Sequence, residues 1–457
     1  MESNRDLLTK PIPGLIRHIA VPGSVGFIFN TLYNIIDTFF GGRISTDALA
    51  AMSLSFPVFF IIIAMGSGIS TGATALMANA LGAGDAKKAR VYSAQAISFS
   101  IILSLILTWV GITFSPFLFR LLGAEGEYLN FALAYINVIF YGTVFFLLSF
   151  TLNSVLVAQG NTKTYRNLLI VGFFLNIILD PWFIYGGYGV PAMGIAGVAW
   201  ATVLVQVVSA GYLFIKIIRT HLIHDGFYEA FRPKLSHYYE LAKQGFPASL
   251  NMMTVAIGVF VITYYVSRYG REAVAAYGIA TRFDQMALLP IMGINMASLA
   301  LVGQNNGARL FNRVREIIKL SLKYGISLAL MSGLAVLLFA RPLVNLFSSD
   351  PAVIAIGEGY LKISVFVYVA YTILFVTVSI LQGLKKPFYA VIVGAYRQIA
   401  APLIIFWLLA SFLGFGLLGI WWGIFIINWS AALFTLFYLK RRMAKLDYVT
   451  RGGKGRT

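Results

Sequence analysis

The stretch APLIIFWLLASFLGFGLLGIWWGIFIINWSAALFTLFYL, residues 401–439, has no charged side chain at any position. A helix needs about 20 consecutive apolar residues to cross a bilayer. The stretch is therefore long enough for two membrane crossings, with a short turn near Gly414–Gly416. It places the chain among proteins with helices in a membrane.

The whole chain has the composition of a membrane protein. Of its 457 residues, 59% are hydrophobic and only 11% are charged, whereas a soluble protein carries about 25% charged residues. A second charge-free block, SFSIILSLILTWVGITFSPFLF, covers residues 98–119. We therefore set aside the alternative of a soluble protein with a very large buried core.

The net charge of +18 is concentrated in short loops between the apolar blocks. These loops and the tail contain Lys87, Lys88, Arg90, Lys163, Arg166, Arg309, Arg313, Arg315, Lys385, Lys386, Lys440, Arg441, Arg442 and Lys445. Loops rich in lysine and arginine stay on the cytoplasmic side. We therefore expect a multi-pass protein of the cell membrane with both termini in the cytoplasm, in contact with lipids and not with nucleic acid.

Motifs for catalysis, metals and nucleotides are missing from the sequence. There is no cysteine, and the four histidines, His18, His221, His224 and His237, show no metal-ligand spacing. No GxxxxGK[ST] phosphate loop and no serine-hydrolase pattern occur. The N-terminus lacks the basic-then-apolar plan of a cleavable signal peptide. We expect no enzymatic activity, no catalytic residue, no cofactor and no ATP as energy source.

The apolar blocks predict an all-α polytopic protein with twelve transmembrane helices. Their expected ranges are 15–40, 50–80, 91–119, 128–158, 165–187, 194–218, 242–268, 274–304, 318–347, 354–382, 389–412 and 418–439. The longest loop, near the middle, divides them into two six-helix bundles. We expect an N-terminal lobe over 1–218, a cytoplasmic linker over 219–241, a C-terminal lobe over 242–440 and a basic cytoplasmic tail over 441–457.

The two halves repeat each other at one constant shift along the chain. The segment 68–90 aligns without a gap on the segment 293–315, with identical glycine, isoleucine, alanine, leucine and arginine positions. Because each half has an even number of helices, both halves insert in the same orientation. This predicts a parallel repeat with a pseudo-two-fold axis along the membrane normal. Two like bundles are most typical of alternating-access transporters.

Two acids in apolar surroundings break this symmetry. Asp37, in the segment NIIDTFF, aligns with Ile262, and Asp180 aligns with Ile405. An ionisable group inside a membrane span is costly and usually functional. Because these acids belong to the N-terminal half alone, a role in function is favoured over a purely structural hydrogen bond between helices.

Polar neighbours share helix faces with both acids. Spacing places Asn30, Tyr33 and Asn34 on the face of Asp37, since all lie three or four residues apart. Asn176 and Asp180 are also four apart, followed directly by Pro181. A carboxyl group in such a place can take up and release a proton. Alternatively, Asp37, Asp180 and Asn176 could together hold Na⁺.

Other intramembrane charges have weaker patterns. Arg282 and Asp284 lie in one predicted helix and are interpreted as a partner pair, or Arg282 contacts a carbonyl group. Lys362 and Arg397 lie about two turns into their helices, from where a long side chain can reach the interface. We expect structural roles for these charges.

Four motifs make the chain resemble the multidrug and toxic compound extrusion (MATE) family over nearly its whole length. They are LYNIIDTFFGG (32–42), AQGNTK (158–163), NIILDP (176–181) and GVAWATVLVQ (197–206). The match points to the DinF-like branch. The resemblance implies efflux of cationic or amphipathic organic compounds driven by inward H⁺ or Na⁺.

The resemblance also assigns residues. Asp37 and Asp180 correspond to the two acids of a coupling site in the N-terminal lobe, and Tyr33, Tyr135, Asn153, Asn176 and Thr202 correspond to its polar network. The other main branch of the family has cation-binding acids in the C-terminal lobe. The corresponding stretches here, 254–265 and 366–376, have no acid.

The resulting hypothesis is a monomeric secondary antiporter with H⁺ or Na⁺ as coupling ion. Asp37, Asp180, Asn176 and Thr202 would form the coupling site, while Asn30, Tyr33, Asn34, Tyr135 and Asn153 would line the substrate cavity. Two alternatives stay open at this stage. One is a flippase for lipids or lipid-linked oligosaccharides of the same superfamily, and the other is a channel or a receptor that does not transport.

Overall fold

The computed structural model describes residues 6–220, 222 and 227–452, and almost all of them are helical. No β-strand occurs among these described residues, where a single β-bridge joins Gly187 and Val190. His221, His224 and the side chain of Lys445 lie outside the description, as do parts of the predicted linker and tail. The structure thus confirms the all-α class.

The chain forms two compact units. The first comprises Val25–Ser249, and the second comprises the described parts of residues 5–24 and 250–457. Two long helices, α2 (Ile12–Ile44) and α9 (Leu235–Ser267), contribute one part to each unit. The predicted lobe limits at residues 218 and 242 stay a prediction.

The remaining helices belong to one unit each. The first unit contains α3 (Thr46–Gly82), α4 (Ala86–Leu121), α5 (Gly126–Ala158), α6 (Lys163–Tyr185), α7 (Ile195–Ile218) and α8 (Phe227–Phe231). The second unit contains α1 (Asp6–Thr9), α10 (Arg271–Gly307), α11 (Phe311–Asn345), α12 (Pro351–Ser364), α13 (Val367–Gly383), α14 (Phe388–Ala395), η2 (Tyr396–Ala400), α15 (Ala401–Phe406), η3 (Trp407–Phe412) and α16 (Gly416–Gly452).

Length and hydropathy make this a multi-pass membrane protein. In the described part of the chain, eleven helices are long and apolar enough to cross a membrane, and the bent pair α12–α13 brings the number to twelve. Large apolar side chains such as Trp109, Phe117 and Leu338 are exposed on the outside of the helices. Lipid, and not water, is the solvent that suits these side chains.

Local signals set several helix starts. Ser45 precedes α3 and accepts a hydrogen bond from the Ala48 amide at 3.0 Å. Asp85 precedes α4 and accepts one from the Lys88 amide at 2.8 Å. Such caps satisfy amide groups that have no partner within the helix.

The helix limits repeat at the predicted shift. Helix α3 begins at residue 46 and ends at 82, and α10 begins at 271 and ends at 307. Helix α5 covers 126–158, and the pair α12–α13 covers 351–383. Both pairs are separated by the same shift as the sequence repeat, so the helix limits follow the repeat, while its parallel orientation stays a prediction.

The turns after these helices repeat as well. Gly84 has a φ of 76°, and its counterpart Arg309 has a φ of 57°. Gly160 and Lys385 form a second such pair, with φ values of 79° and 59°. Glycine adopts this left-handed conformation without strain, whereas arginine and lysine do not. The turn geometry is thus kept even where the glycine is not.

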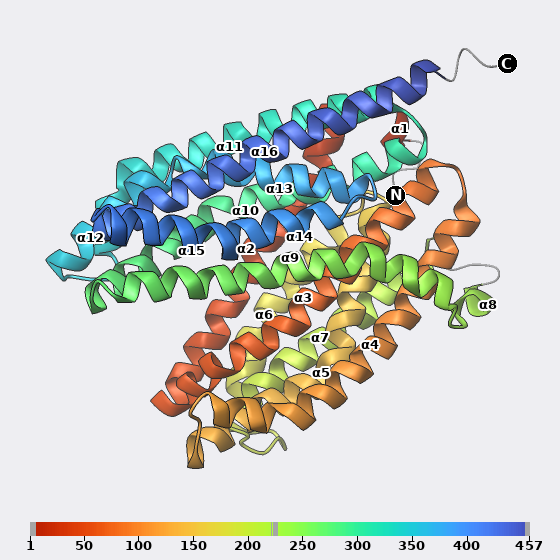
Figure 1. Cartoon of the computed structure of the whole chain (residues 1–457). Coiled ribbons are helices and arrows are strands. Elements are labelled where there is room, and N and C mark those ends of the chain that lie inside the picture. The colour runs from red at the N-terminus through yellow and green to blue at the C-terminus, as the bar shows by residue number, and fades with distance from the viewer. Residues whose placement is uncertain (1–5, 221, 223–226, 453–457) are drawn as a thin grey trace. The chain divides into compact units, whose positions relative to one another are not determined.

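The first unit has its own core, in which α5 packs against both α3 and α7, three of the helices labelled in Figure 1. At Gly142 of α5, an added Cβ atom would lie 2.3 Å from the Val203 side chain of α7. Glycine therefore allows these two helices to approach closely. Val203 directly follows Thr202, so this contact helps to position one of the predicted site residues.

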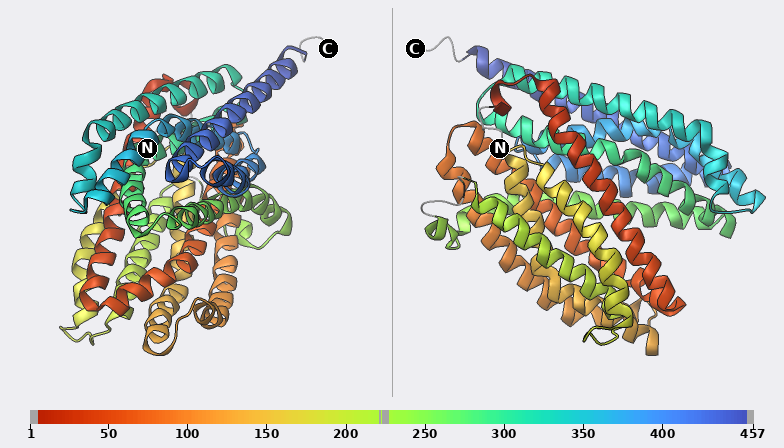
Figure 2. Two further views of the ribbon diagram at one scale, coloured as in Figure 1. Left: turned by 60° about the vertical axis from the view of Figure 1, so that its left-hand side comes forward. Right: turned by 180° about the vertical axis from the view of Figure 1, so that it is seen from behind.

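The second unit departs from regular helix geometry at two places, both between residues 351 and 412, which form the light-blue to blue part of the ribbon in Figure 2. Helices α12 and α13 meet at a bend of 52°, where the Trp429 indole donates a hydrogen bond to the Phe366 carbonyl at 3.1 Å. The span over 388–412 contains the two π-helical segments η2 and η3. Both predicted spans, 354–382 and 389–412, are present, and the bend and the π-helical segments are features that the sequence had not indicated.

Candidate functional site

Helices α2 and α6 bring the two acids of the first unit together around one amide. Asn176 Nδ2 donates a hydrogen bond to Asp37 Oδ1 at 2.5 Å and another to Asp180 Oδ2 at 3.0 Å. Asn176 and Asp180 are fully buried, and Asp37 is 7% exposed. The amide group thus links two carboxyl groups that are far apart in the sequence.

Helices α7 and α5 complete the surroundings. The Thr202 hydroxyl group lies 3.3 Å from Asp37 Oδ2 and 3.0 Å from the Val198 carbonyl oxygen, both of which can accept its proton. Tyr33 lies beside Asp37 and Thr202, and Tyr135 lies within the electrostatic reach of both acids. Four helices therefore enclose Asp37 and Asp180. We call Tyr33, Asp37, Tyr135, Asn176, Asp180 and Thr202 the acid cluster.

The acid cluster has unused capacity for hydrogen bonds. The carboxyl groups of Asp37 and Asp180 both accept from the Asn176 amide, which places them close enough to interact electrostatically. Asn176 Oδ1 and Asp180 Oδ1 are buried and have no hydrogen-bond partner among the described residues. Buried acceptors rarely stay unsatisfied. The cluster can therefore accept a proton, a water molecule or a small cation.

Three of the predicted site residues lie apart from the cluster. Asn30 and Asn34 are exposed, and the Asn34 amide donates to the Asn30 carbonyl of its own helix at 2.8 Å. Asn153 is buried in α5. It lies five helical turns beyond Tyr135, or about 27 Å along a helix axis. The structure does not bring Asn30, Asn34 or Asn153 into the acid cluster.

The second unit contains a buried acid with different surroundings. Asp284 of α10 accepts hydrogen bonds from the hydroxyl groups of Tyr360 at 2.7 Å, Ser364 at 2.9 Å and Tyr368 at 2.7 Å. Arg282 is exposed, so the predicted pairing of Arg282 with Asp284 was wrong. The three partners are four residues apart in sequence, but they lie on both sides of the break between α12 and α13, so the spacing alone did not indicate them.

The two remaining intramembrane cations differ from each other. Lys362 is exposed and forms an ion pair with Glu358 at 2.7 Å, and its position at the membrane interface stays a prediction. Arg397 is buried and lies over the rings of Tyr371 and Phe375. The expectation that Arg397 extends to the interface was therefore wrong.

Metal chemistry finds little support in the geometry. Within the described ranges, no group of three or more histidine or acidic side chains could hold a metal ion. Na⁺ differs from such metals because it needs only oxygen ligands. Asp37, Asp180 and the unpartnered oxygen of Asn176 are the residues that could supply them.

Fold and site together define a duplicated helical membrane protein in which two buried acids share one amide in the first of its two units. The family model described as MatE matches residues 22–182 and again residues 247–407. The second match begins and ends at the counterparts of the first, so it follows the internal repeat. The chain belongs to the MATE family.

Individual relatives extend over nearly the whole chain. A protein named FAD transporter, from Shewanella oneidensis, is 28% identical over 402 residues, which are 87% of this chain and 88% of the relative. A protein named probable multidrug resistance protein NorM, from Thermotoga maritima, is 28% identical over 438 residues, 95% of this chain and 93% of the relative. A solved outward-facing structure of a multidrug resistance MATE family transporter has a TM-score of 0.89, with 26% identity and 98% and 99% coverage of the two chains.

Proposed function

We propose that the protein is a secondary antiporter of the DinF-like branch. It exports cationic or amphipathic organic compounds in exchange for inward protons, by alternating access. Membership of the MATE family and the names of the multidrug relatives support the substrate class. One observation carries the coupling mechanism: Asp37 and Asp180 share the Asn176 amide in a buried cluster of a single unit.

A change of protonation alters the hydrogen bonds of this cluster. When a carboxyl group takes up a proton, one of its oxygens becomes a hydrogen-bond donor instead of an acceptor. The amide of Asn176 already occupies one acceptor of each acid. Protonation therefore forces Asp37 on α2 to repack against α6 and α7. In this way, binding of a proton is coupled to a movement of α2.

Helix α2 has a weak point that suits such a movement. It continues through Pro22, which has no amide hydrogen and removes one hydrogen bond from the helix. Bending at a proline costs less than bending elsewhere in a helix. Protonation at Asp37 and bending near Pro22 would together change the exposure of the substrate cavity and release the substrate.

The orientation of the Asn176 amide favours H⁺ over Na⁺ as the coupling ion. Its NH₂ group faces both carboxyl groups, at the position where a cation would need an oxygen ligand. A sodium site would require the amide to flip, so that Oδ1 and Nδ2 exchange places and Oδ1 faces the acids. Protons need no such change, because the carboxyl oxygens themselves bind them.

The driving force limits the stoichiometry. Exchange of one proton for one monovalent cation moves no net charge, so only the pH difference drives it, with about 1.4 kcal/mol per pH unit. Exchange of two protons adds the membrane potential, with about 2.3 kcal/mol per charge and 100 mV. Asp37 and Asp180 together could carry either one proton or two protons.

Efflux from proteoliposomes tests the proposal. A fluorescent organic cation is loaded, a pH gradient is imposed in sodium-free buffer, and the wild type is compared with Asp37→Asn. The matched control is Asp47→Asn, which changes an exposed acid in the first turn of α3 in the same way. We expect efflux that follows the pH gradient in the wild type and the control, and no gradient-driven efflux in Asp37→Asn.

Other outcomes decide against parts of the proposal. Efflux that needs added sodium would make the acid cluster a sodium site. If neither gradient moves the cation and Asp37→Asn behaves like the wild type, drug antiport is wrong. Flipping of a labelled lipid by the same vesicles would then support the flippase alternative.

We further propose a monomer in the cell membrane with both termini in the cytoplasm. The chain has no cysteine, so a single introduced cysteine reports its own side of the membrane. In right-side-out vesicles, an impermeant maleimide should label Tyr188→Cys, whose position between α6 and α7 is fully exposed, and should not label Lys87→Cys. Labelling of Lys87→Cys but not of Tyr188→Cys would contradict the proposed orientation with both termini in the cytoplasm. A cross-linked dimer would contradict the proposed monomer.

A further inference from the structure

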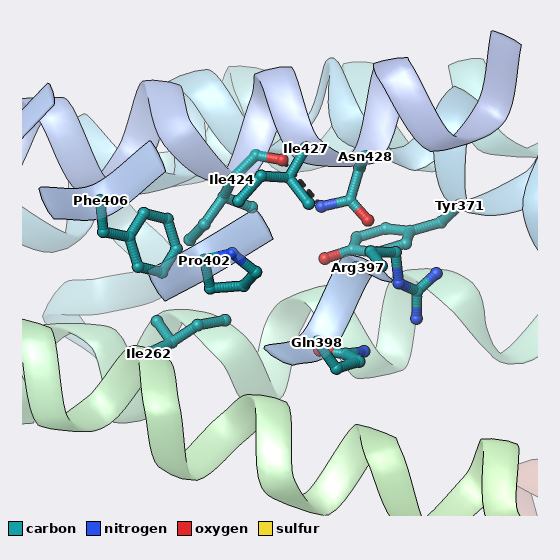
Figure 3. A pocket seen from close by; sticks show the side chains of 9 residues that line it. All are labelled: Ile262, Tyr371, Arg397, Gln398, Pro402, Phe406, Ile424, Ile427 and Asn428. Atoms are coloured by element: carbon teal, nitrogen blue, oxygen red, sulfur yellow. Dashed lines mark hydrogen bonds between the residues drawn. The ribbon is translucent and has the colours of Figure 1, made fainter. Parts of the chain in front are cut away.

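In the second unit, the counterpart of the acid cluster is a small space beside a buried cation (Figure 3). Arg397, Ile262 and Ile427 line this space, which has room for about one water molecule. By the internal repeat, the two isoleucines correspond to Asp37 and Thr202. The space is too small for an organic ligand. Cations that can reach a partner lie instead at exposed helix ends.

Helix α16 continues without a break from an apolar part into a basic part. Its residues 416–439 have no charge, and Lys440, Arg441 and Arg442 follow directly. Figure 2 shows the last part of α16 projecting beyond the other helices of the second unit. Lys440 and Arg441 are exposed. These cations are therefore accessible to a partner at the level where the apolar part of the helix ends.

Aromatic rings hold both guanidinium groups in place. The Arg441 guanidinium carbon lies 4.4 Å from the centre of the Phe437 ring, and that of Arg442 lies 5.1 Å from the centre of the Tyr438 ring. Arg442 Nε also donates a hydrogen bond to the Tyr438 hydroxyl group at 3.0 Å. No acidic side chain forms an ion pair with either arginine among the described residues. A ring over the flat face of a guanidinium group leaves N–H donors at its edge available, so both arginines present donors in fixed positions.

A stacked pair of tyrosines joins a further basic turn to this end of α16. Tyr389 of α14 stacks on Tyr438 with ring centres 4.1 Å apart, and its hydroxyl group donates to Thr435 Oγ1 at 3.1 Å. Lys386 precedes Tyr389 by three residues, in the turn before α14, and is exposed. The turn before α14 and the end of α16 thus meet around the stacked rings. We call Lys386, Tyr389, Tyr438, Lys440, Arg441 and Arg442 the basic–aromatic cluster.

An apolar stripe on α16 leads directly to the cluster. Leu433, Phe434 and Phe437 are 60%, 56% and 51% exposed. Leu433, Phe437 and Arg441 follow each other at intervals of four residues, so they share one face of the helix. Exposed apolar side chains of a transmembrane helix contact lipid tails. The cations therefore lie where lipid tails end and head groups begin.

The first unit lacks most of this cluster. By the internal repeat, the counterparts of Lys386, Tyr389, Tyr438 and Arg442 are Asn161, Thr164, Leu213 and Ile217, none of which is basic or aromatic. Lys216, the counterpart of Arg441, still lies over an aromatic ring, that of Tyr212, at 5.3 Å. One cation over one ring is thus common to both units. The complete cluster belongs to the second unit alone, which favours a specific ligand there.

We propose that the basic–aromatic cluster binds the phosphate group of an anionic phospholipid. Arg441 and Arg442 offer paired N–H donors to the phosphate oxygens, a geometry that suits arginine better than lysine. The acyl chains lie along the stripe of Leu433, Phe434 and Phe437, which a free phosphate ion could not use. Several basic residues directly after a transmembrane helix are typical of sites for anionic lipids. The site is separate from the acid cluster, and the proposal does not depend on antiport.

Native mass spectrometry of the purified protein in detergent tests the proposal. The probes are dioleoylphosphatidylglycerol, which is anionic, and dioleoylphosphatidylcholine, which has the same acyl chains but no net charge. The measurement gives the Kd of each lipid. We expect the anionic lipid to bind at least tenfold more tightly, because each basic residue near a membrane surface strengthens binding about fivefold. Glycerol 3-phosphate, which has no acyl chain, should not displace it at equal concentration.

Variants locate the binding. Arg441→Gln/Arg442→Gln should remove the preference for the anionic lipid. Lys216→Gln/Arg219→Gln is the matched control, because it removes two cations from the corresponding end of α7 and should keep the preference. Arg441→Lys/Arg442→Lys keeps both charges and should weaken binding of the anionic lipid several-fold. This third variant tests the arginine geometry even if the first one fails to fold.

Three results would overturn the proposal. They are equal binding of the two lipids by the wild type, the same loss of preference in both glutamine variants, and displacement of the anionic lipid by glycerol 3-phosphate at equal concentration. The second result would reduce the preference to overall charge, and the third would assign the cluster to a soluble phosphate compound. Organic-cation efflux by Arg441→Gln/Arg442→Gln in phosphatidylcholine vesicles should follow the pH gradient as in the wild type, so failure here is distinguishable from failure of the antiport proposal.

Discussion

The two units hold opposite chemistry on the same helical framework. Where the first unit has Asp37, Asp180 and Thr202, the second has Ile262, Ile405 and Ile427. The first site contains groups whose charge changes when a proton binds, whereas the second contains Arg397, which keeps its charge at any physiological pH. Duplication preserved the helix limits and the turns but not the site, so the fold repeats while the function does not.

The buried acids of the two units differ in how well they are satisfied. Asp284 accepts three hydroxyl hydrogen bonds and has no second acid beside it in the described structure. Asp37 shares one amide with Asp180, and unpartnered acceptors lie next to it. A fully satisfied acid stabilises a structure, and an incompletely satisfied one is free to change its state. This contrast leads to the following predictions.

The largest expected effect is on transport, at Asp37. Asp37→Asn keeps the size of the side chain but cannot release a proton, so pH-driven efflux should fall by at least about 100-fold, within the range of 10²–10⁴ that a positioned proton-transfer group contributes. The remaining efflux should not depend on external pH. Initial rates in proteoliposomes between pH 5.5 and 8.5 provide the measurement. A pH-dependent rate that survives in the variant would contradict the role of Asp37.

The next effect is on stability, at Asp284. Asp284→Leu leaves three hydroxyl groups without their acceptor. At roughly 0.6 kcal/mol for each interhelical hydrogen bond in a membrane, the free energy of unfolding should fall by about 2 kcal/mol. Unfolding in mixed micelles measures it, with Glu358→Gln, an acid in an interfacial ion pair, as the control. Transport by the remaining folded protein should stay coupled to protons, and uncoupling would place a second coupling site in this unit.

A smaller effect is expected at Thr202. Thr202→Val removes one neutral hydrogen bond to Asp37, worth about 0.5–1.5 kcal/mol, so the coupled efflux rate should change by about two- to tenfold. Thr143→Val is a matched control, since the buried Thr143 hydroxyl bonds only to the Ile139 carbonyl of its own helix. Equal effects of the two substitutions would exclude a specific role for Thr202.

The smallest effect is expected at Asn34. Because its amide donates to its own helix and lies outside the acid cluster, Asn34→Ala should change the pH profile of efflux by less than about twofold. The same assay measures it. A large shift of the pH profile would show that Asn34 joins the acid cluster in another state of the transport cycle. The assignment of Asn34 to a position outside the acid cluster would then be wrong.

The sequence predicted most of the first site and little of the second. Asp37, Asn176 and Asp180 could be predicted because an acid in an apolar helix is rare and helical spacing shows its neighbours. Arg397 was assigned to the interface because snorkelling is the usual solution for a long cation in a membrane helix. Its true surroundings depend on the aromatic rings of α13 and on a π-helical turn, which have no sequence signal of comparable strength.

The partners of Asp284 were missed for a similar reason. Arg282 is close to Asp284 in sequence, and opposite charges suggest a pair. Two residues apart on a helix, however, point to different sides. The three hydroxyl groups belong to α12 and α13 on both sides of a helix break, and only tertiary packing brings them to α10.

The left-handed turns at Arg309 and Lys385 bear on how the protein is made. Each residue adopts a conformation that costs roughly 1–2 kcal/mol without glycine, although the first unit uses Gly84 and Gly160 at the same points. Both positive charges lie in loops between helices, and lysine and arginine in such loops favour the cytoplasmic side during insertion. Arg309→Gly and Lys385→Gly should thus raise the melting temperature of the correctly inserted protein and increase the fraction of chains that insert upside down. Such a result would mean that these two residues lower the stability of the finished fold and increase the accuracy of its insertion.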